Sequence, residues 1–173
     1  MKIIHCNFTE HAQSILDIFN HEIINTTALY DYQPRSIANM ETWFNNKAAG
    51  KFPVLGVVND ANQLAGFASY GTFRGWPAYK YSVEHSVYVH QDFRGKGLAS
   101  LLIKELIAQA KQQQLHTLIG AIDNDNTSSI ALHKKLGFHH AGTIKQAGFK
   151  FGRWLDVVFY QLIIETPEHP IDG

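Results

Sequence analysis

The sequence predicts an α/β domain in which one mixed sheet carries helices on both faces. Three observations lead to this prediction. Apolar residues recur at strand or helix spacing in the order strand, two helices, three strands, helix, strand, helix and two strands. No segment repeats at a period of roughly 20–50 residues, which argues against a solenoid or a propeller. A chain of 173 residues without a low-complexity linker fits one domain, expected over residues 1–165, with a loose tail at 166–173.

The first half of the chain predicts two helices and a hairpin of strands. Residues 2–8 are half apolar and predict an edge strand. Apolar residues then recur at helical spacing, and the polar residues before them predict helix starts. The expected elements are a helix over residues 10–25 capped by Thr9, a helix from Ser36 to near Gly50, and strands over 53–58 and 63–73 around a turn at 59–62.

The second half of the chain predicts strands that alternate with helices. Gly75 and Pro77 interrupt the preceding strand. The expected elements are a strand over residues 79–89, a helix over 97–113, a strand over 117–122, a short helix from Asn126 or Thr127 to Gly137, and strands over 138–144 and 154–164 joined by a hairpin at 148–153.

Composition excludes several classes of protein. Lys+Arg and Asp+Glu number 15 each, so no net field attracts nucleic acid or an anionic membrane surface. The single Cys6 excludes an intrachain disulfide and a multi-cysteine zinc site, and the ten histidines show no ligand spacing. No apolar run reaches the roughly 18 residues that a membrane span needs, and the N-terminus lacks a signal-peptide core. We therefore expect a cytoplasmic protein with no metal, nucleic-acid or membrane partner.

A glycine turn follows the strand at residues 79–89 and precedes a helix. It reads Arg94, Gly95, Lys96, Gly97, Leu98 and Ala99. Backbone N–H groups in such a turn, together with the positive end of the helix dipole, can hold a phosphate. The spacing fits neither the nucleotide-triphosphate loop nor the dinucleotide fingerprint. From spacing alone, an anion site and an ordinary glycine turn stay equally open.

Glu84 is an unusual acid within an apolar strand. Strand alternation places Glu84, Ser86 and Tyr88 on one face and Val83 and His85 on the other. A carboxylate that lines a cleft can act as a general base, whereas one that faces solvent has no such role. Both interpretations of Glu84 stay open. His85 is expected in the core unless a bulge turns it outward.

Two further groups of residues have both a functional and a structural interpretation. Asn126 caps a helix or contacts a ligand, and His133 is either a packed histidine or a proton donor. Four residues flank the predicted cleft in sequence only, and each is either a substrate contact or a surface residue: Arg74, Tyr79, Lys80 and Arg153.

Together these stretches resemble the GNAT superfamily of N-acetyltransferases, and more closely its phosphinothricin and methionine sulfoximine acetyltransferase branch. The likeness covers nearly the whole chain and is carried by residues 83–89, 94–98, 122–130, 132–133, 136–138 and 148–156. The resemblance implies a sheet splayed open around acetyl-CoA. It implies that the cofactor is bound by Val87, Tyr88 and Val89, by the turn from Arg94 through Gly95, Lys96, Gly97 and Leu98 to Ala99, and by Asn126.

The resemblance also implies acetyl transfer to a small amino acid analogue in a homodimeric enzyme. Glu84 would take a proton from the amine, and His133 occupies the position where many members carry a tyrosine that protonates the leaving thiolate. The cationic and aromatic residues Arg74, Tyr79, Lys80 and Arg153 would bind the substrate with Glu84. Two alternatives stay open: an acetyltransferase for a protein or peptide amine, and a non-catalytic module that binds acyl-CoA.

Overall fold

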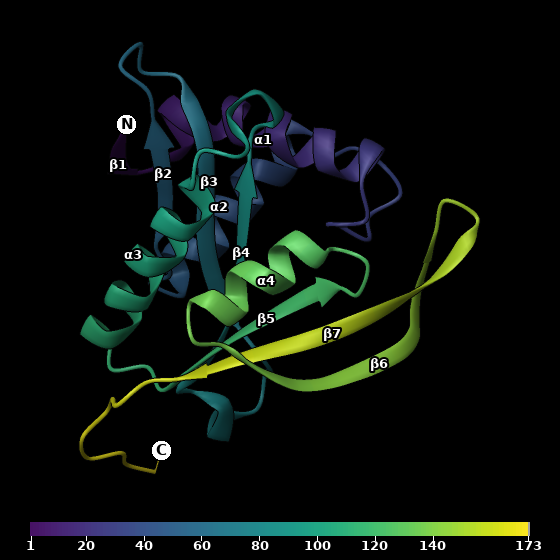
Figure 1. The fold of residues 1–173 in the computed structure, drawn as a ribbon. Helices are drawn as coiled ribbons and strands as arrows, with labels where there is room; N and C mark the ends of the chain where they lie inside the picture. Colours follow the sequence, from purple (N-terminus) through teal and green to yellow (C-terminus); the bar gives the residue numbers. More distant parts are fainter. Residues whose placement is uncertain (173) are drawn as a thin grey trace.

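The structure, a computed structural model, describes residues 1–172 and forms one sheet with helices around it (Figure 1). The strands are β1 (Lys2–His5), β2 (Val54–Val58), β3 (Leu64–Thr72), β4 (Ser82–Val89), β5 (Thr117–Asp123), β6 (His139–Lys150) and β7 (Arg153–Ile163). The helices are α1 (Phe8–Asn25), α2 (Ile37–Ala49), α3 (Leu98–Gln112) and α4 (Thr127–Lys135), with 3-10 turns η1 (Pro77–Tyr79) and η2 (Gln91–Phe93).

The sheet is mixed and open at its centre, which confirms the predicted fold class. Its strand order is β1-β2-β3-β4-β5-β7-β6, and only the β4–β5 pair is parallel. These two strands pair from Ser82 opposite Thr117 to Glu84 opposite Ile119, although β4 continues to Val89. Beyond Glu84 the two central strands therefore diverge, and the side of β4 that faces β5 has no strand partner.

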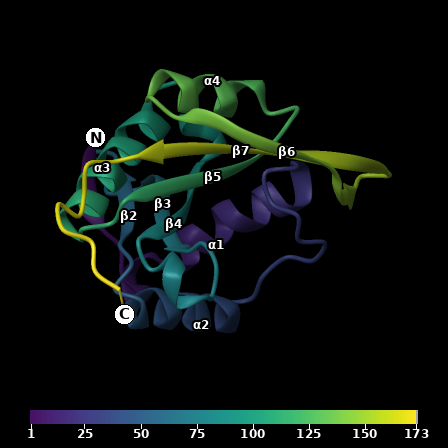
Figure 2. The same ribbon diagram turned by 90° about the horizontal axis from the view of Figure 1, so that it is seen from below.

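The helices cover both faces of the sheet, as Figure 2 shows: α3 and α4 lie on one side, α1 and α2 on the other. The apolar side of α3 supplies Leu102, Ile103 and Leu106 to a core with β2, β3, β4 and β5. A second core places Ile15 and Phe19 of α1 against α2 and Phe67. None of the helices among the described residues has the length and apolar character needed to cross a membrane.

Two predicted element boundaries were wrong for local reasons. Asn7, not Thr9, caps α1, because its side-chain oxygen accepts the Glu10 N–H at 2.9 Å and the helix begins one residue later. The strand expected from residue 79 begins at Ser82, because Pro77 starts a 3-10 turn.

The hairpin of β6 and β7 is longer than the sequence predicts. Its strands pair up to Lys150 opposite Arg153, around a turn in which Phe151 and Gly152 have φ of 51° and 73°. Two positive φ angles match the twist that a two-residue hairpin favours. Most of β6 is exposed on both faces, so no alternation of apolar residues marks it in the sequence.

The tail expected to be loose is attached to the domain. The Thr166 carbonyl lies 2.8 Å from His116 Nδ1, and the Ile171 N–H donates to the Tyr81 hydroxyl at 3.1 Å. Gly173, the end of that predicted tail, lies outside the described residues.

Candidate functional site

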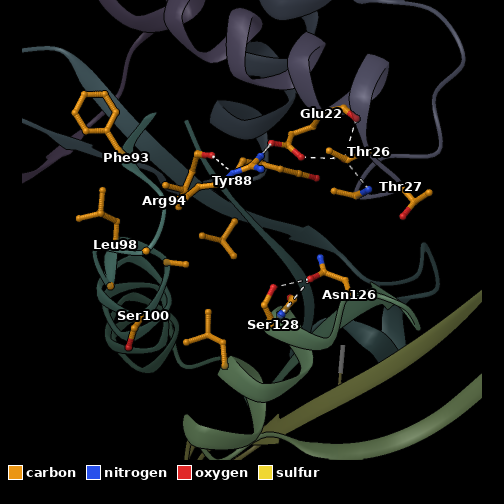
Figure 3. Close-up of a pocket in the computed structure, with 18 of the residues that line it drawn as sticks. Glu22, Thr26, Thr27, Tyr88, Phe93, Arg94, Leu98, Ser100, Asn126 and Ser128 are labelled. Carbon is orange, nitrogen blue, oxygen red and sulfur yellow. Dashed lines mark hydrogen bonds and ion pairs between the residues drawn. The ribbon is translucent and has the colours of Figure 1, made fainter. Parts of the chain in front are cut away.

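A cavity of about 540 Å³ opens where β4 and β5 diverge (Figure 3). Its walls come from the end of α1, the free edge of β4, the turn before α3 and the start of α4. A cavity of this size lies within the range of pockets that bind small molecules and cofactors. Nine of the predicted cofactor residues line it: Val87, Tyr88, Val89, Arg94, Gly95, Gly97, Leu98, Ala99 and Asn126.

The glycine turn presents backbone N–H groups to this cavity. Gly95 and Gly97 have φ of 74° and 76°, a backbone conformation that residues with a Cβ rarely adopt. A Cβ added at either glycine would meet nothing within 4 Å, so the space in front of the turn is open. Gly97 is the N-cap of α3, and the first N–H groups of a helix have no partner within the helix. The turn therefore fits a diphosphate.

The two cations of the turn differ in their surroundings. Lys96 does not line the cavity, and its Nζ lies 5.0 Å from the centre of the Phe93 ring. Arg94 points into the wall: Nη2 donates to Oε1 of Glu22, and Nε donates to the Val89 carbonyl at 3.3 Å. Glu22 lines the cavity and is 5% exposed. Glu22 was not among the predicted site residues, although an acid at an apolar position of a helix is a signal that could have indicated it.

The free edge of β4 contributes backbone groups, rather than side chains, to the gap between β4 and β5. The Tyr88 ring packs on Phe19 and Phe67 with centroid distances of 5.2 and 5.3 Å, and burial raises its pKa to about 12. This packing holds the strand in place while alternate N–H and C=O groups face the gap left by β5. Such an edge can bind an amide-containing chain by strand-like hydrogen bonds.

Asn126 lines the main cavity and is also the N-cap of α4. Its Oδ1 accepts the Ser129 N–H at 3.1 Å and the Ser128 hydroxyl at 3.0 Å, which caps the helix. With the oxygen so engaged, the amide nitrogen projects toward the cavity (Figure 3). Both interpretations left open for Asn126 are therefore compatible with its position.

His133 lies in a buried histidine pair behind a smaller cavity of about 70 Å³. Its Nε2 is 2.9 Å from Nε2 of His85, and its Nδ1 is 2.8 Å from the Ser129 carbonyl. Burial lowers the pKa of both rings, that of His85 to about 3. The strand from Val83 to Val89 keeps an unbroken register with β3, so no bulge turns His85 outward. These contacts favour a packed, neutral His133 and oppose the proton-donor role.

Glu84 lies at the last paired position before the strands diverge. It stands opposite Gly71 on β3 and Ile119 on β5, and its side chain is exposed. Burial of part of the carboxyl raises its pKa, and the charge of Arg74 opposes this shift. Glu84 does not line the main cavity, but Ser86, two residues further along the same face, lines the smaller one.

The four predicted substrate residues do not form one cluster. Arg74 and Tyr79 both pack on Phe73, at 5.1 and 5.8 Å, and Arg74 is the cation whose charge acts on Glu84. Lys80 instead lies over the Tyr81 ring at 5.1 Å. Arg153 instead pairs with Asp125, at 2.7 Å, at the rim of the main cavity.

Asp123, which lines the smaller cavity, and Tyr30, which contacts it, were missed in the sequence. The Tyr30 hydroxyl is 3.5 Å from Oδ2 of Asp123, and burial and this carboxylate raise its pKa to about 12. Asp123 is 6% exposed and lines that cavity with Asn126. The two residues lie 93 positions apart, so no local pattern connects them. Within residues 1–172, no group of three or more His, Cys, Asp or Glu side chains is arranged as metal ligands.

Comparison with known proteins identifies the family. Residues 15–138 match the model of the Acetyltransferase (GNAT) family. The chain is 44% identical over 151 residues to the L-methionine sulfoximine/L-methionine sulfone acetyltransferase of Pseudomonas aeruginosa, which covers 87% of this chain and 88% of the relative.

Two solved structures extend the comparison to the whole fold. A structure from Acinetobacter baylyi has a TM-score of 0.98 and 56% identity, covering 99% of this chain and 96% of the other. A structure from Salmonella typhimurium with its cofactor acetyl-CoA has a TM-score of 0.93 and 34% identity, covering 99% and 98%. The splayed sheet, the glycine turn and these similarities agree, and the chain belongs to the GNAT family of acetyltransferases.

Proposed function

We propose that this protein transfers the acetyl group of acetyl-CoA to the amino group of a small amino acid analogue. The observation that carries the proposal is the course of the main cavity, which joins the glycine turn before α3 to the free edge of β4, the strand that bears Glu84. A carrier held by its diphosphate at that turn has its thioester directed along β4 toward this carboxylate. The name of the Pseudomonas aeruginosa relative supports methionine sulfoximine and methionine sulfone as acceptors, and the resemblance seen in the sequence adds phosphinothricin.

Glu84 is the proposed general base. An amine at neutral pH is mostly protonated and must lose a proton before it attacks the thioester carbonyl. Glu84 takes this proton directly or through a water molecule, and the raised pKa of its carboxyl makes it a stronger base than an ordinary glutamate. Arg74, whose charge reaches Glu84, is the candidate partner for the carboxylate of the acceptor, with Tyr79 beside it. Lys80 and Arg153 would have to leave their present partners to contribute.

Backbone groups and Asn126 stabilise the charges that develop. Attack on the thioester carbonyl gives an oxyanion, which an N–H group near Val89 on the free edge of β4 is placed to bind. The carbon–sulfur bond then breaks and leaves a thiolate, which takes up the second proton of the attacking nitrogen. His133 has both ring nitrogens engaged, so we assign the thiolate to the Asn126 amide nitrogen, which donates a hydrogen bond without giving up a proton.

A release assay for free CoA tests the function. Methionine sulfone, methionine sulfoximine, phosphinothricin, methionine and a peptide with a free N-terminus would be compared at equal concentration. We expect turnover with at least one of the first three and little with the peptide. Turnover with the peptide alone would favour a protein acceptor, and binding of acetyl-CoA without release of CoA for any amine would favour a non-catalytic module.

We also propose that the protein is a homodimer in the cytoplasm, where acetyl-CoA is available to it. The hairpin of β6 and β7 leaves five large apolar side chains 45–63% exposed: Ile144, Phe149, Phe151, Trp154 and Ile163. β6 is also an edge strand of the sheet, with one side unpaired. A second copy that covers this hairpin would bury both features.

A further inference from the structure

An ion pair between the buried carboxylate of Glu22 and the half-exposed guanidinium of Arg94 connects the glycine turn to the end of α1. Glu22 stands on the inner side of α1, where an unpaired carboxylate would be strongly destabilising. Arg94 supplies the opposite charge through Nη2, and its Nε is bound to the Val89 carbonyl (Figure 3). The guanidinium is therefore held against α1 and the end of β4, on the wall of the cavity.

The same carboxylate also binds the loop that follows α1. The Thr26 hydroxyl lies 2.9 Å from Oε2 of Glu22 and 2.9 Å from the Glu22 carbonyl. The Ala28 N–H donates to that hydroxyl at 3.0 Å. Thr26 and Ala28 both line the main cavity, and the loop continues to Tyr30, which meets Asp123 at the smaller one. Glu22 thus lies between the glycine turn and this acceptor-side loop, residues 26–30.

Lys150 holds the outer side of the same segment. From β6 its Nζ donates to the carbonyls of Ile23, Thr26 and Leu29 at 2.7, 2.9 and 2.6 Å. Lys150 is 5% exposed, so these carbonyls satisfy a buried ammonium group. The backbone of the segment is anchored by Lys150, whereas its side toward the cavity is anchored by Glu22.

We propose that Glu22 is a positioning residue that couples the glycine turn to the acceptor-side loop, and that Arg94 acts through Glu22 rather than on the diphosphate. The proposal rests on the proposed function for the identity of the two ligands. The diphosphate is then bound by the backbone N–H groups of the turn. The ion pair fixes residues 26–30 and so prepares the place where the acceptor binds, and CoA seated on the turn strengthens this effect.

Steady-state kinetics with two acetyl donors test the role of Arg94. S-acetylpantetheine lacks the diphosphate of acetyl-CoA, so a residue that binds phosphate matters only for the latter. For Glu22→Gln, Arg94→Gln and the double variant we expect a similar rise, about tenfold, in KM for methionine sulfone with either donor. Gly97→Val, which blocks the backbone of the turn, is the contrasting variant and should weaken only the use of acetyl-CoA. A loss in Arg94→Gln confined to acetyl-CoA, or losses that multiply in the double variant, would overturn the proposal.

Hydrogen exchange tests the coupling without turnover. In the wild type, addition of CoA should slow exchange of the amides in residues 26–30 at least fivefold. Thr26→Val keeps the shape of the side chain but removes its hydroxyl, and should abolish this protection while CoA still binds by calorimetry. If Glu22→Gln unfolds at too low a temperature to be assayed, Thr26→Val still tests the coupling. Protection that persists in Thr26→Val would refute the coupling, whereas protection in a wild type that acetylates no amine would refute only the proposed function.

Discussion

At the scale of single residues, Glu84 is where the proposed chemistry depends on one side chain. It stands where β4 still pairs with both neighbours, so its backbone is fixed between Gly71 and Ile119. Its carboxyl is partly desolvated, which raises its pKa, while Arg74 keeps the ionised form accessible. A rigid backbone and a strengthened base are both what proton abstraction from an amine requires.

Replacement of Glu84 tests this role. Glu84→Gln should lower kcat about 100-fold or more, because a positioned general base contributes roughly that factor, and should change acetyl-CoA binding less than about twofold. The activity of the wild type should rise as pH increases through the raised pKa of Glu84, because the carboxyl must be ionised to accept a proton. Glu84→Gln should lack this rise. Glu41→Gln, an exposed acid on α2, is the control. Unchanged turnover in Glu84→Gln across pH would remove the residue from the base role.

Gly120 makes room for the histidine pair. A Cβ at Gly120 would lie 3.1 Å from the rings of both His85 and His133. Gly120→Ala should therefore destabilise the fold by about 1–3 kcal/mol, the usual range for an overpacked core. Urea unfolding measures this, with Gly142→Ala, where an added Cβ meets nothing within 4 Å, as the matched control. Equal stability of the two variants would mean that the pair is not tightly packed.

The same pair predicts a loss of stability in acid. Burial, with His133 adding to it, lowers the pKa of His85 to about 3, well below the ordinary value of about 6.5. The unfolded chain takes up this proton below about pH 6.5 and the folded chain does not, so stability falls with pH from about 6.5 toward 3, by up to about 1.4 kcal/mol per unit. Urea unfolding at pH 7.5, 6.5 and 5.5 should show a steeper decline for the wild type than for His85→Gln. Parallel declines would contradict a neutral buried His85.

At the scale of elements, the turn and the first residues of α3 act as one binding unit. The two positive φ angles aim successive N–H groups at the same open space, and the helix adds its positive end. This arrangement is local in sequence, and the side chains of the turn contribute little to it. The element therefore depends on backbone conformation more than on charge.

A substitution in this turn should weaken acetyl-CoA binding. Gly97→Val places a β-branched residue at a φ of 76°, which is strained, and puts its side chain in the space in front of the turn. Calorimetry should show at least a tenfold weaker affinity for CoA. Gly142→Val, at an open position with ordinary φ, should bind as the wild type does. Equal affinity of the two variants would refute binding by the turn.

At the scale of the whole molecule, the hairpin of β6 and β7 projects from the domain and supports the site from outside. Figure 1 shows it as a long ribbon that extends past α4. Its turn end supplies Lys150 to the segment after α1, and the exposed aromatic residues Phe149, Phe151 and Trp154 lie at the same end. One hairpin thus serves both the acceptor-side loop and the proposed contact between two copies.

The proposed dimer predicts a change of mass on loss of one aromatic residue. Trp154 is 58% exposed and packs on Phe149 at 5.1 Å, so Trp154→Ser removes the centre of the apolar face. Light scattering should show a dimer for the wild type and a monomer for the variant. Ile37→Ser, which removes a 47% exposed apolar residue from α2, should remain dimeric. A monomeric wild type at micromolar concentration would refute the dimer.

The sequence by itself determined the features that arise from short segments. The glycine turn, the alternation that separates Glu84 from His85 and the order of the elements each depend on residues close together in the chain. Backbone conformation and side-chain periodicity are local properties, so a local pattern predicts them.

Only the tertiary structure decided which of these residues meet. Arg94 pairs with Glu22 across 72 positions, Tyr30 approaches Asp123 across 93, and His85 binds His133 across 48. The last contact favours a packed ring at a position that the sequence also offered as a proton donor. Such contacts depend on how the helices and strands pack, and a polar side chain has the same local pattern whether its partner is solvent, a ligand or a distant residue of the chain.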